Sequence, residues 1–193
     1  MNYTIGLITL FSIVILSACM TTSSNLKTSF ETSSANGDIG TSLSQTRSGK
    51  ELIDGNGYAY AAGKGPDYGF QAVAGVIPGS DMGVPIYANA TYTGEWELAK
   101  ISSIYISGNE ITGFIGSDGG SITLNANFAE QTLTGSDGLL EVNGTMNGNN
   151  LSGSVIFNGT TGELTGLVGE QGAVGAFHGE GDTQIYAGGF LVD

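Results

Sequence analysis

The sequence predicts an all-β fold: a small eight-stranded antiparallel up-and-down β-barrel with a disordered N-terminal tether. The composition is the first indication, because the 193 residues include 33 Gly but only 3 Pro, and 12% are charged. From residue 86 onward, apolar and polar residues alternate with a period of two, which is typical of half-buried strands. Turn signals rich in Gly, Asn and Asp separate these runs, and no helical periodicity of useful length follows residue 18.

Residues 1–18 are predicted to be a lipoprotein signal peptide. Residues 5–18 carry no charge and are long enough for the apolar region of a signal peptide, but short for a membrane-spanning helix. Leu16-Ser17-Ala18 precedes Cys19, the only cysteine, and this ending resembles a bacterial lipobox. The resemblance implies cleavage before Cys19 and acylation of its sulfur and new amine. The alternative is an ordinary secretory signal, and the lack of Lys or Arg in residues 1–4 departs from the usual lipoprotein pattern.

Two segments precede the predicted barrel. Residues 19–49 are expected to hold the lipidated Cys19 and a disordered tether. Fourteen of the thirty positions from 20 to 49 are Ser or Thr, and no apolar periodicity runs through them. Such a tether spans roughly 30 Å as a flexible chain. Residues 50–85 are a Gly-rich lead-in in which we expect a short strand or two and a connection. We expect this lead-in to pack on the barrel through its aromatic residues, Tyr58, Tyr60, Tyr68 and Phe70.

Residues 86–193 are predicted to form the barrel. Strands are expected at 86–98, 121–128, 130–135, 140–146, 151–157, 163–169, 172–178 and 184–192, with turn signals at 117–120, 136–138, 147–150 and 158–162. Closing such a sheet buries every apolar face and removes the sheet edges. We expect the interior to be filled, with Trp96, Phe128, Met146 and Phe157 converging in it.

A transmembrane β-barrel is the alternative architecture, because it has the same alternation and strand number. Its apolar side chains would face lipid, its strands would run for about 9–11 residues, and aromatic residues would gather at the strand ends. The strands expected here are mostly shorter, and their Trp and Tyr residues do not cluster at strand ends. The sequence therefore favours a barrel outside the bilayer.

The charge distribution argues strongly against two classes of partner. The net charge is −13, and the stretch from 101 to 193 has ten acidic residues and no Lys or Arg. Nucleic acid and anionic lipid are disfavoured, because neutralising phosphate needs cations. A basic protein partner or a divalent cation remains compatible with this charge, and so does solubility alone.

No candidate set of catalytic residues emerges from the sequence. His178 is the only histidine and no nucleophile motif accompanies it, so neither a catalytic triad nor an imidazole metal shell is expected. Glu95 and Glu97 have glycosidase-like spacing along a strand, but both are expected to face solvent. Asp118 and Asp137 lie in Gly-Ser-Asp-Gly segments that would share Ca²⁺ only if adjacent, and Asx turns explain both. We expect a protein that is not an enzyme, with no cofactor and no metal site.

Three segments together resemble the barrel domain of transferrin-binding protein B-like surface lipoproteins. Tyr92, Gly94 and Trp96 match the Tyr-x-Gly-x-Trp opening strand of that family, and residues 119–157 resemble its central meander. The segments 175–179 (GAFHG) and 188–190 (GGF) are similar to its closing pattern. The resemblance covers residues 55–193. It implies a lipid-anchored, surface-displayed barrel at the bacterial outer membrane, acting as a binding module in iron or haem acquisition or in contact with a protein.

The chain also departs from that family. The receptors have two lobes, each with a handle domain beside its barrel, and large loops that the short turns expected here cannot supply. The binding residues and the identity of the partner therefore do not carry over from the resemblance. Two other functions stay open: a structural or envelope-interaction lipoprotein without a small ligand, and a lipocalin-like carrier with a hollow interior.

Overall fold

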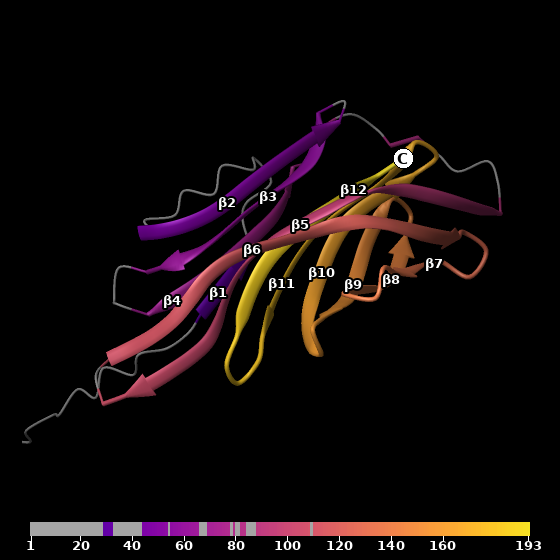
Figure 1. Cartoon of the computed structure of the whole chain (residues 1–193). Helices are drawn as coiled ribbons and strands as arrows, with labels where there is room; N and C mark the ends of the chain where they lie inside the picture. The colour runs from indigo at the N-terminus through magenta and orange to yellow at the C-terminus, as the bar shows by residue number, and fades with distance from the viewer. Residues whose placement is uncertain are drawn as a thin grey trace, which may run out of the picture.

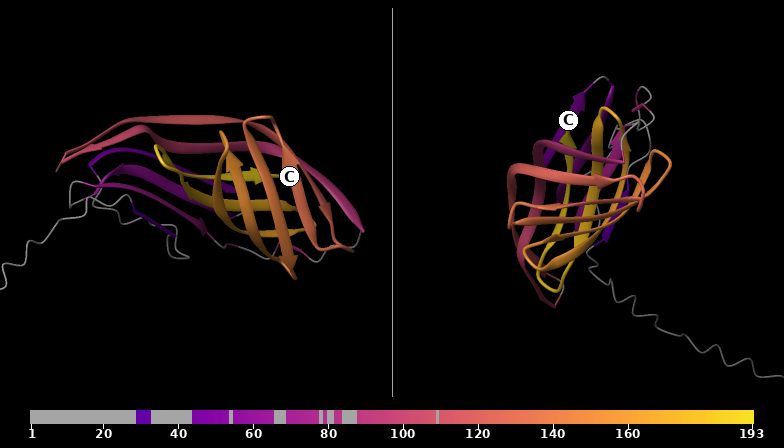
Figure 2. Two further views of the ribbon diagram at one scale, coloured as in Figure 1. Left: turned by 90° about the horizontal axis from the view of Figure 1, so that it is seen from below. Right: turned by 90° about the vertical axis from the view of Figure 1, so that its right-hand side faces the viewer.

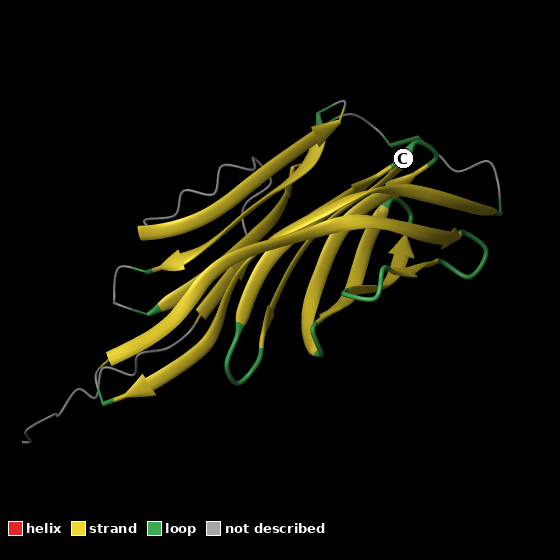
Figure 3. Cartoon of the chain, viewed as in Figure 1, coloured by secondary structure: helices red, strands yellow, loops and turns green. Residues whose placement is uncertain are grey.

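The computed structural model describes residues 29–32, 44–53, 55–65, 69–77, 79, 82–83, 88–108 and 110–193, and every regular element in these ranges is a strand (Figure 3). Side chains are described from residue 55 onward. The signal peptide and Cys19 lie outside the described residues. The described part of the chain contains no helix long and apolar enough to cross a membrane.

A closed antiparallel barrel forms the C-terminal part of the protein (Figure 1). Its strands are β5 (Asn89–Ser107), β6 (Glu110–Asn127), β7 (Thr132–Ser136), β8 (Leu140–Asn147), β9 (Asn150–Phe157), β10 (Thr160–Gly169), β11 (Gly172–Glu180) and β12 (Ile185–Val192). Each strand pairs with the next along the chain, and β12 returns to pair with β5. The predicted eight-stranded up-and-down barrel is confirmed.

The turn predicted at residues 117–120 is wrong. These residues lie within β6 and pair with residues 96–99 of β5, and the chain reverses instead after Gly108, whose φ is 59°. Asp118 forms an ion pair with Lys100 at 2.9 Å, so its carboxylate joins β6 to β5 and does not stabilise a turn. A Cβ on Gly120 would lie 3.1 Å from the indole nitrogen of Trp96, so this glycine makes room for a ring.

A second, four-stranded sheet lies beside the barrel, in the order β1-β4-β3-β2. Its strands are β1 (Ser29–Thr32), β2 (Ser44–Ile53), β3 (Asn56–Lys64) and β4 (Phe70–Ile77); β1 runs parallel to β4, and the other pairs are antiparallel. Residues 29–32 and 44–49, expected in the disordered tether, are therefore paired strands. Main-chain hydrogen bonds to a neighbouring strand need no apolar pattern, so a Ser- and Thr-rich composition did not reveal them.

The four-stranded sheet packs on the outer wall of β5, β11 and β12 (Figures 1 and 2). Tyr58, Tyr60 and Phe70 from this sheet form one hydrophobic cluster with outward-facing barrel residues, Ala99, Ile101, Val174, Ala176, Ile185 and Ala187. β11 and β12 are consequently buried on both faces over nearly their whole length. Continuous burial removes the period-two alternation from these strands.

The barrel interior is filled with side chains. One hydrophobic cluster joins residues from all eight strands, including Trp96, Met146 and Phe157, with Phe128 packed against it. The ring of Phe157 meets those of Trp96 and Tyr186 edge to face, with centroids 6.0 and 5.4 Å apart. Such packing is typical of small barrels whose inward side chains meet at the axis.

Candidate functional site

The candidate site is at the end of the barrel where β5 and β6 continue past the other strands. We call residues 101–108 and 110–117 the arm; it projects to the left in the left view of Figure 2. Among the described residues, the large apolar side chains that are most exposed gather here. Phe114 is 74% exposed, Tyr105 67% and Ile106 51%, and Leu139, 48% exposed, lies in the β7–β8 turn at the same end of the barrel.

The arm has two different faces. Ile101, Ile104 and Ile111 are buried in the cluster shared with the four-stranded sheet. Gly113 lies on this face as well, since a Cβ there would come within 2.9 Å of the Phe70 ring. The sheet thus supports one face of the arm.

The opposite face of the arm carries the exposed aromatic residues. Tyr105 pairs with Thr112 and Phe114 pairs with Ser102, and directly paired residues point to the same side of an antiparallel sheet. The register shifts between Ser102 and Tyr105, where Ser103 has a positive φ of 52°. This β-bulge restores Tyr105 to the face that Phe114 occupies. The two rings are therefore diagonal neighbours on an uncovered surface.

Below the arm, polar contacts close this end of the barrel. The Trp96 indole N–H donates to Oδ2 of Asp137 at 2.6 Å, and the N–H groups of Leu139 and Leu140 donate to Oδ1 at 2.8 Å. Burial raises the pKa of Asp137, but the hydrogen bonds from Leu140, Leu139 and Trp96 outweigh burial and hold this pKa below its ordinary value. Asp137 therefore stays ionised and fixes the β7–β8 turn on the barrel.

Lys100 contributes to the same end of the barrel. Its ammonium group forms the ion pair with Asp118 and lies 5.4 Å from the centre of the Phe157 ring. Lys100 is the last Lys or Arg of the sequence. Because its charge is matched by Asp118, the surface beyond it is acidic in balance, with Glu110 at the tip of the arm and Asp137 at the turn.

The sequence-predicted carboxylate pairs form no common site. Glu95 and Glu97 are exposed, as expected, and Glu95 accepts from Ser121 at 2.8 Å while Glu97 accepts from Tyr60 at 3.0 Å. Asp118 and Asp137 each have their own donors, Lys100 and the Trp96 indole respectively. No group of three or more potential metal ligands occurs among the residues whose positions are described.

His178 lies in the barrel wall and is only 6% exposed. It is paired with Glu163 of β10, on the outward-facing side of β11. Burial lowers the pKa of His178, and the nearby Glu163 carboxylate opposes this shift. The position agrees with the expectation that its ring is part of the barrel wall.

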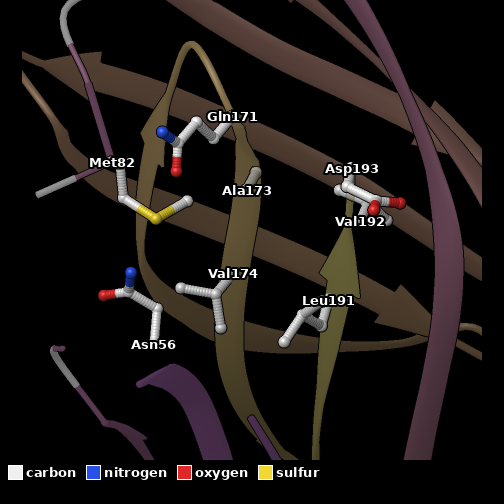
Figure 4. Close-up of a pocket in the computed structure, with 8 residues that line it drawn as sticks. All are labelled: Asn56, Met82, Gln171, Ala173, Val174, Leu191, Val192 and Asp193. Atoms are coloured by element: carbon white, nitrogen blue, oxygen red, sulfur yellow. The ribbon is translucent and has the colours of Figure 1, made fainter. Parts of the chain in front are cut away.

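A cavity of about 310 Å³ opens at the other end of the barrel (Figure 4). Its lining is apolar on the side of β11 and β12 and polar where Asn56, Gln171 and Asp193 meet it. The side-chain Oδ1 of Asn56 already accepts from the N–H of Gly79 at 2.8 Å, so part of this polar lining is engaged within the protein. This volume is at the lower limit of ligand pockets.

The predictions from the sequence did not include Tyr105, Phe114 or Leu139 as candidate functional residues. A signal was present: residues 111–115 (ITGFI) place apolar side chains on both faces of a strand that should alternate. One set, Ile111 and Ile115, faces the four-stranded sheet, and Phe114 is left on the other side. Recognising this required knowledge of the sheet that covers the first set.

No family model and no curated protein sequence matches this chain. Among solved structures, transferrin binding protein B from Actinobacillus pleuropneumoniae H49 is 15% identical, with 82% of this chain and 84% of that chain covered and a TM-score of 0.48. Isotype 1 transferrin binding protein B from serogroup B Neisseria meningitidis is 15% identical, with 76% and 34% covered and a TM-score of 0.45. The haemoglobin receptor HpuA from Kingella denitrificans is 14% identical, with 74% and 56% covered and a TM-score of 0.41. The two transferrin binding protein B structures belong to the family that the sequence resembles.

Proposed function

We propose that this protein is an outer-membrane lipoprotein, anchored through acylated Cys19 and displayed at the cell surface, whose barrel is a non-catalytic module that binds a protein partner. The exposed aromatic face of the arm, with Tyr105 and Phe114, is the observation that carries this proposal. Large exposed apolar side chains that lie together indicate an interaction surface, whereas single ones are ordinary. Aromatic residues are also enriched at the centres of protein interfaces.

The filled barrel favours a protein partner over a small ligand. A lipocalin-like carrier holds its ligand inside the barrel, but here Trp96, Phe157 and Tyr186 occupy that space. The arm, in contrast, presents a rigid surface, because the four-stranded sheet holds its other face. Binding to a preformed surface loses less conformational freedom than binding to a loop.

We further propose that the partner belongs to iron or haem acquisition and itself carries the iron. This part rests on the sequence resemblance of residues 92–96, 119–157 and 175–190 to the transferrin-binding protein B barrel. His178, the only imidazole, lies in the buried wall and not on the arm. A haem bound at the arm would therefore lack a histidine of this chain as its axial ligand.

Protease treatment of intact cells tests display and anchoring together. We expect the barrel to be lost from intact wild-type cells, and the Cys19→Ala protein to be found in the medium or the periplasm. Intact cells that produce the wild-type protein are then compared with intact cells that produce Phe114→Ser for binding of transferrin, haemoglobin and serum proteins. Complete protection of the barrel until the outer membrane is permeabilised would refute surface display and favour an envelope-interaction protein.

A further inference from the structure

β6 has a long edge that no described strand covers. β6 pairs with β5 from Glu110 to Asn127, but β7 pairs with β6 only through residues 124–127. Between residues 110 and 123, the other side of β6 therefore pairs with no strand of the described chain. Such an edge presents main-chain N–H and C=O groups that can pair with another extended segment.

The direction of these main-chain groups follows from one hydrogen bond. The N–H of Thr93 donates to the carbonyl of Asp193, so Thr93 directs its main-chain groups towards the β12 side of β5 and away from β6. Thr123, its partner on β6, accordingly directs its own groups away from β5. The alternation continues along the strand, so Ser121, Gly119, Ser117, Ile115, Gly113 and Ile111 all direct their N–H and C=O groups to the open edge.

The edge lacks the usual protection against pairing. Natural edge strands commonly carry Pro, Lys or an inward-pointing charge that prevents strand addition. Residues 110–123 contain no Pro, Lys or Arg. Their one mid-strand charge, Asp118, is neutralised by Lys100 at 2.9 Å, although its Oδ1 also accepts from the N–H of Gly119 at 3.3 Å. The exposed Phe114 and Leu139 lie on the same part of the molecule and provide apolar contacts beside the edge.

Charge decides which extended segment fits. Glu110 lies at one end of the edge, and Asp137 follows the last residue of β7 at the other. The chain has no Lys or Arg after residue 100, and its net charge is −13. A second copy of this chain would bring its own acidic arm against the first, which is unfavourable, whereas a basic segment is attracted to both ends.

We propose that the β6 edge binds an extended, basic segment of the partner protein by β-strand addition. This inference rests on the proposed function only in that the partner is a protein. The main-chain hydrogen bonds would supply affinity, the face with Tyr105 and Phe114 would hold apolar side chains of the added strand, and Glu110 and Asp137 would select basic ones.

Three synthetic peptides test the mode of binding on the full chain purified in detergent. Each has about fourteen residues, because the free edge from 110 to 123 and an added strand rise by the same roughly 3.3 Å per residue. The first alternates valine and lysine, the second has the same sequence with every main-chain amide N-methylated, and the third alternates valine and glutamate. We expect the first to bind at least about tenfold more tightly than either of the others, because the second lacks main-chain donors and the third repels the acidic ends.

Variants at Ser117 show whether binding uses this edge. Ser117 is exposed and its N–H is directed outward, so Ser117→Pro removes an edge donor without breaking the pairing with β5. We expect Ser117→Pro and Ser117→Lys to weaken the valine–lysine peptide about fivefold or more, and the matched control Ser117→Ala to bind as wild type. The lysine variant keeps the test decisive if the proline variant does not fold.

Three results would overturn the proposal. Equal binding of the N-methylated peptide would show that charge alone attracts the peptide, and wild-type binding by Ser117→Lys would place it elsewhere. Dimerisation in sedimentation velocity that Ser117→Pro abolishes would identify a second copy as the occupant. These measurements use purified protein, so their failure is separate from a failure of surface display, which only the cell experiment reports.

Discussion

Replacing Asp137 with alanine removes the acceptor that holds the β7–β8 turn on the barrel. The Trp96 indole N–H, which donates to Asp137 at 2.6 Å, belongs to a side chain with no exposed surface. The variant lacks the carboxylate that accepts this hydrogen bond, and losing a hydrogen bond to a charged group costs about 1.5–3 kcal/mol. The N–H groups of Leu139 and Leu140 lose the same carboxylate. Because water replaces it in part, we expect a total loss of about 2–4 kcal/mol in the free energy of unfolding.

A double-mutant cycle isolates the contribution of the Trp96–Asp137 contact. Unfolding in urea is followed by circular dichroism for wild type, Asp137→Ala, Trp96→Phe and the double variant, because Trp96 is the only tryptophan and its replacement removes the fluorescence signal. We expect a coupling energy of about 1.5–3 kcal/mol between the two residues. The control Glu141→Ala, which removes an exposed acceptor of Asn143, should change stability by less than about 0.5 kcal/mol. A coupling energy below about 0.5 kcal/mol would refute this account of the turn.

Three further predictions concern His178 in the barrel wall, the contact between β12 and β5 that closes the barrel, and the exposed face of the arm. Burial lowers the pKa of His178 below its ordinary value of 6.5, so the unfolded chain binds more protons and the free energy of unfolding should fall as the pH is lowered from about 7.5 to about 5.5. Urea unfolding at several pH values should show a smaller fall for His178→Phe than for wild type. An equal fall in the two proteins would contradict this account. Gly188→Ala should destabilise by at least about 2 kcal/mol in urea, since its Cβ would lie 2.3 Å from the Glu97 carbonyl, whereas Gly116→Ala, whose nearest neighbour is 3.9 Å away, should cost less than about 1 kcal/mol. Phe114→Ser should leave stability within about 0.5 kcal/mol while it abolishes partner binding, and a large loss of stability would show that Phe114 is structural.

Much of the barrel could be predicted because its strands face water on one side. β8 is the clearest case: its residues alternate between buried and exposed from Leu140 to Asn147, an Asp-Gly turn precedes it and a turn of Asn and Gly follows it. The filled interior also followed from the sequence, since large residues such as Trp96 and Phe157 occupy inward positions at which a hollow barrel would need small ones. Alternation and turn chemistry are local properties, so a single sequence reveals them.

The four-stranded sheet and the arm could not be predicted for the same physical reason. β3 is buried at nearly every position, so its residues 56–64 show no alternation, and β2 is an edge strand of polar composition. The Gly-Ser-Asp-Gly segment at 116–119 reads as a turn because Asp and Gly favour turns in isolation. Its place within a strand depends on Lys100, to which Asp118 pairs, and on the Trp96 ring beside Gly120. Both partners lie on β5, so the signal is nonlocal.

The position of the four-stranded sheet explains why the arm is ordered and yet incomplete. An isolated two-stranded hairpin is marginally stable in water, so the β5–β6 arm needs a packing partner beyond the barrel. The sheet provides one through Ile101, Ile104 and Ile111, and it covers a single face of the arm. The other face and the β6 edge gain nothing from this packing, so their residues are free to be selected for a different contact. β6 is held in place by its neighbours and is unpaired along one edge, so it already has the conformation that an added strand requires. Binding therefore costs little further conformational entropy in the arm.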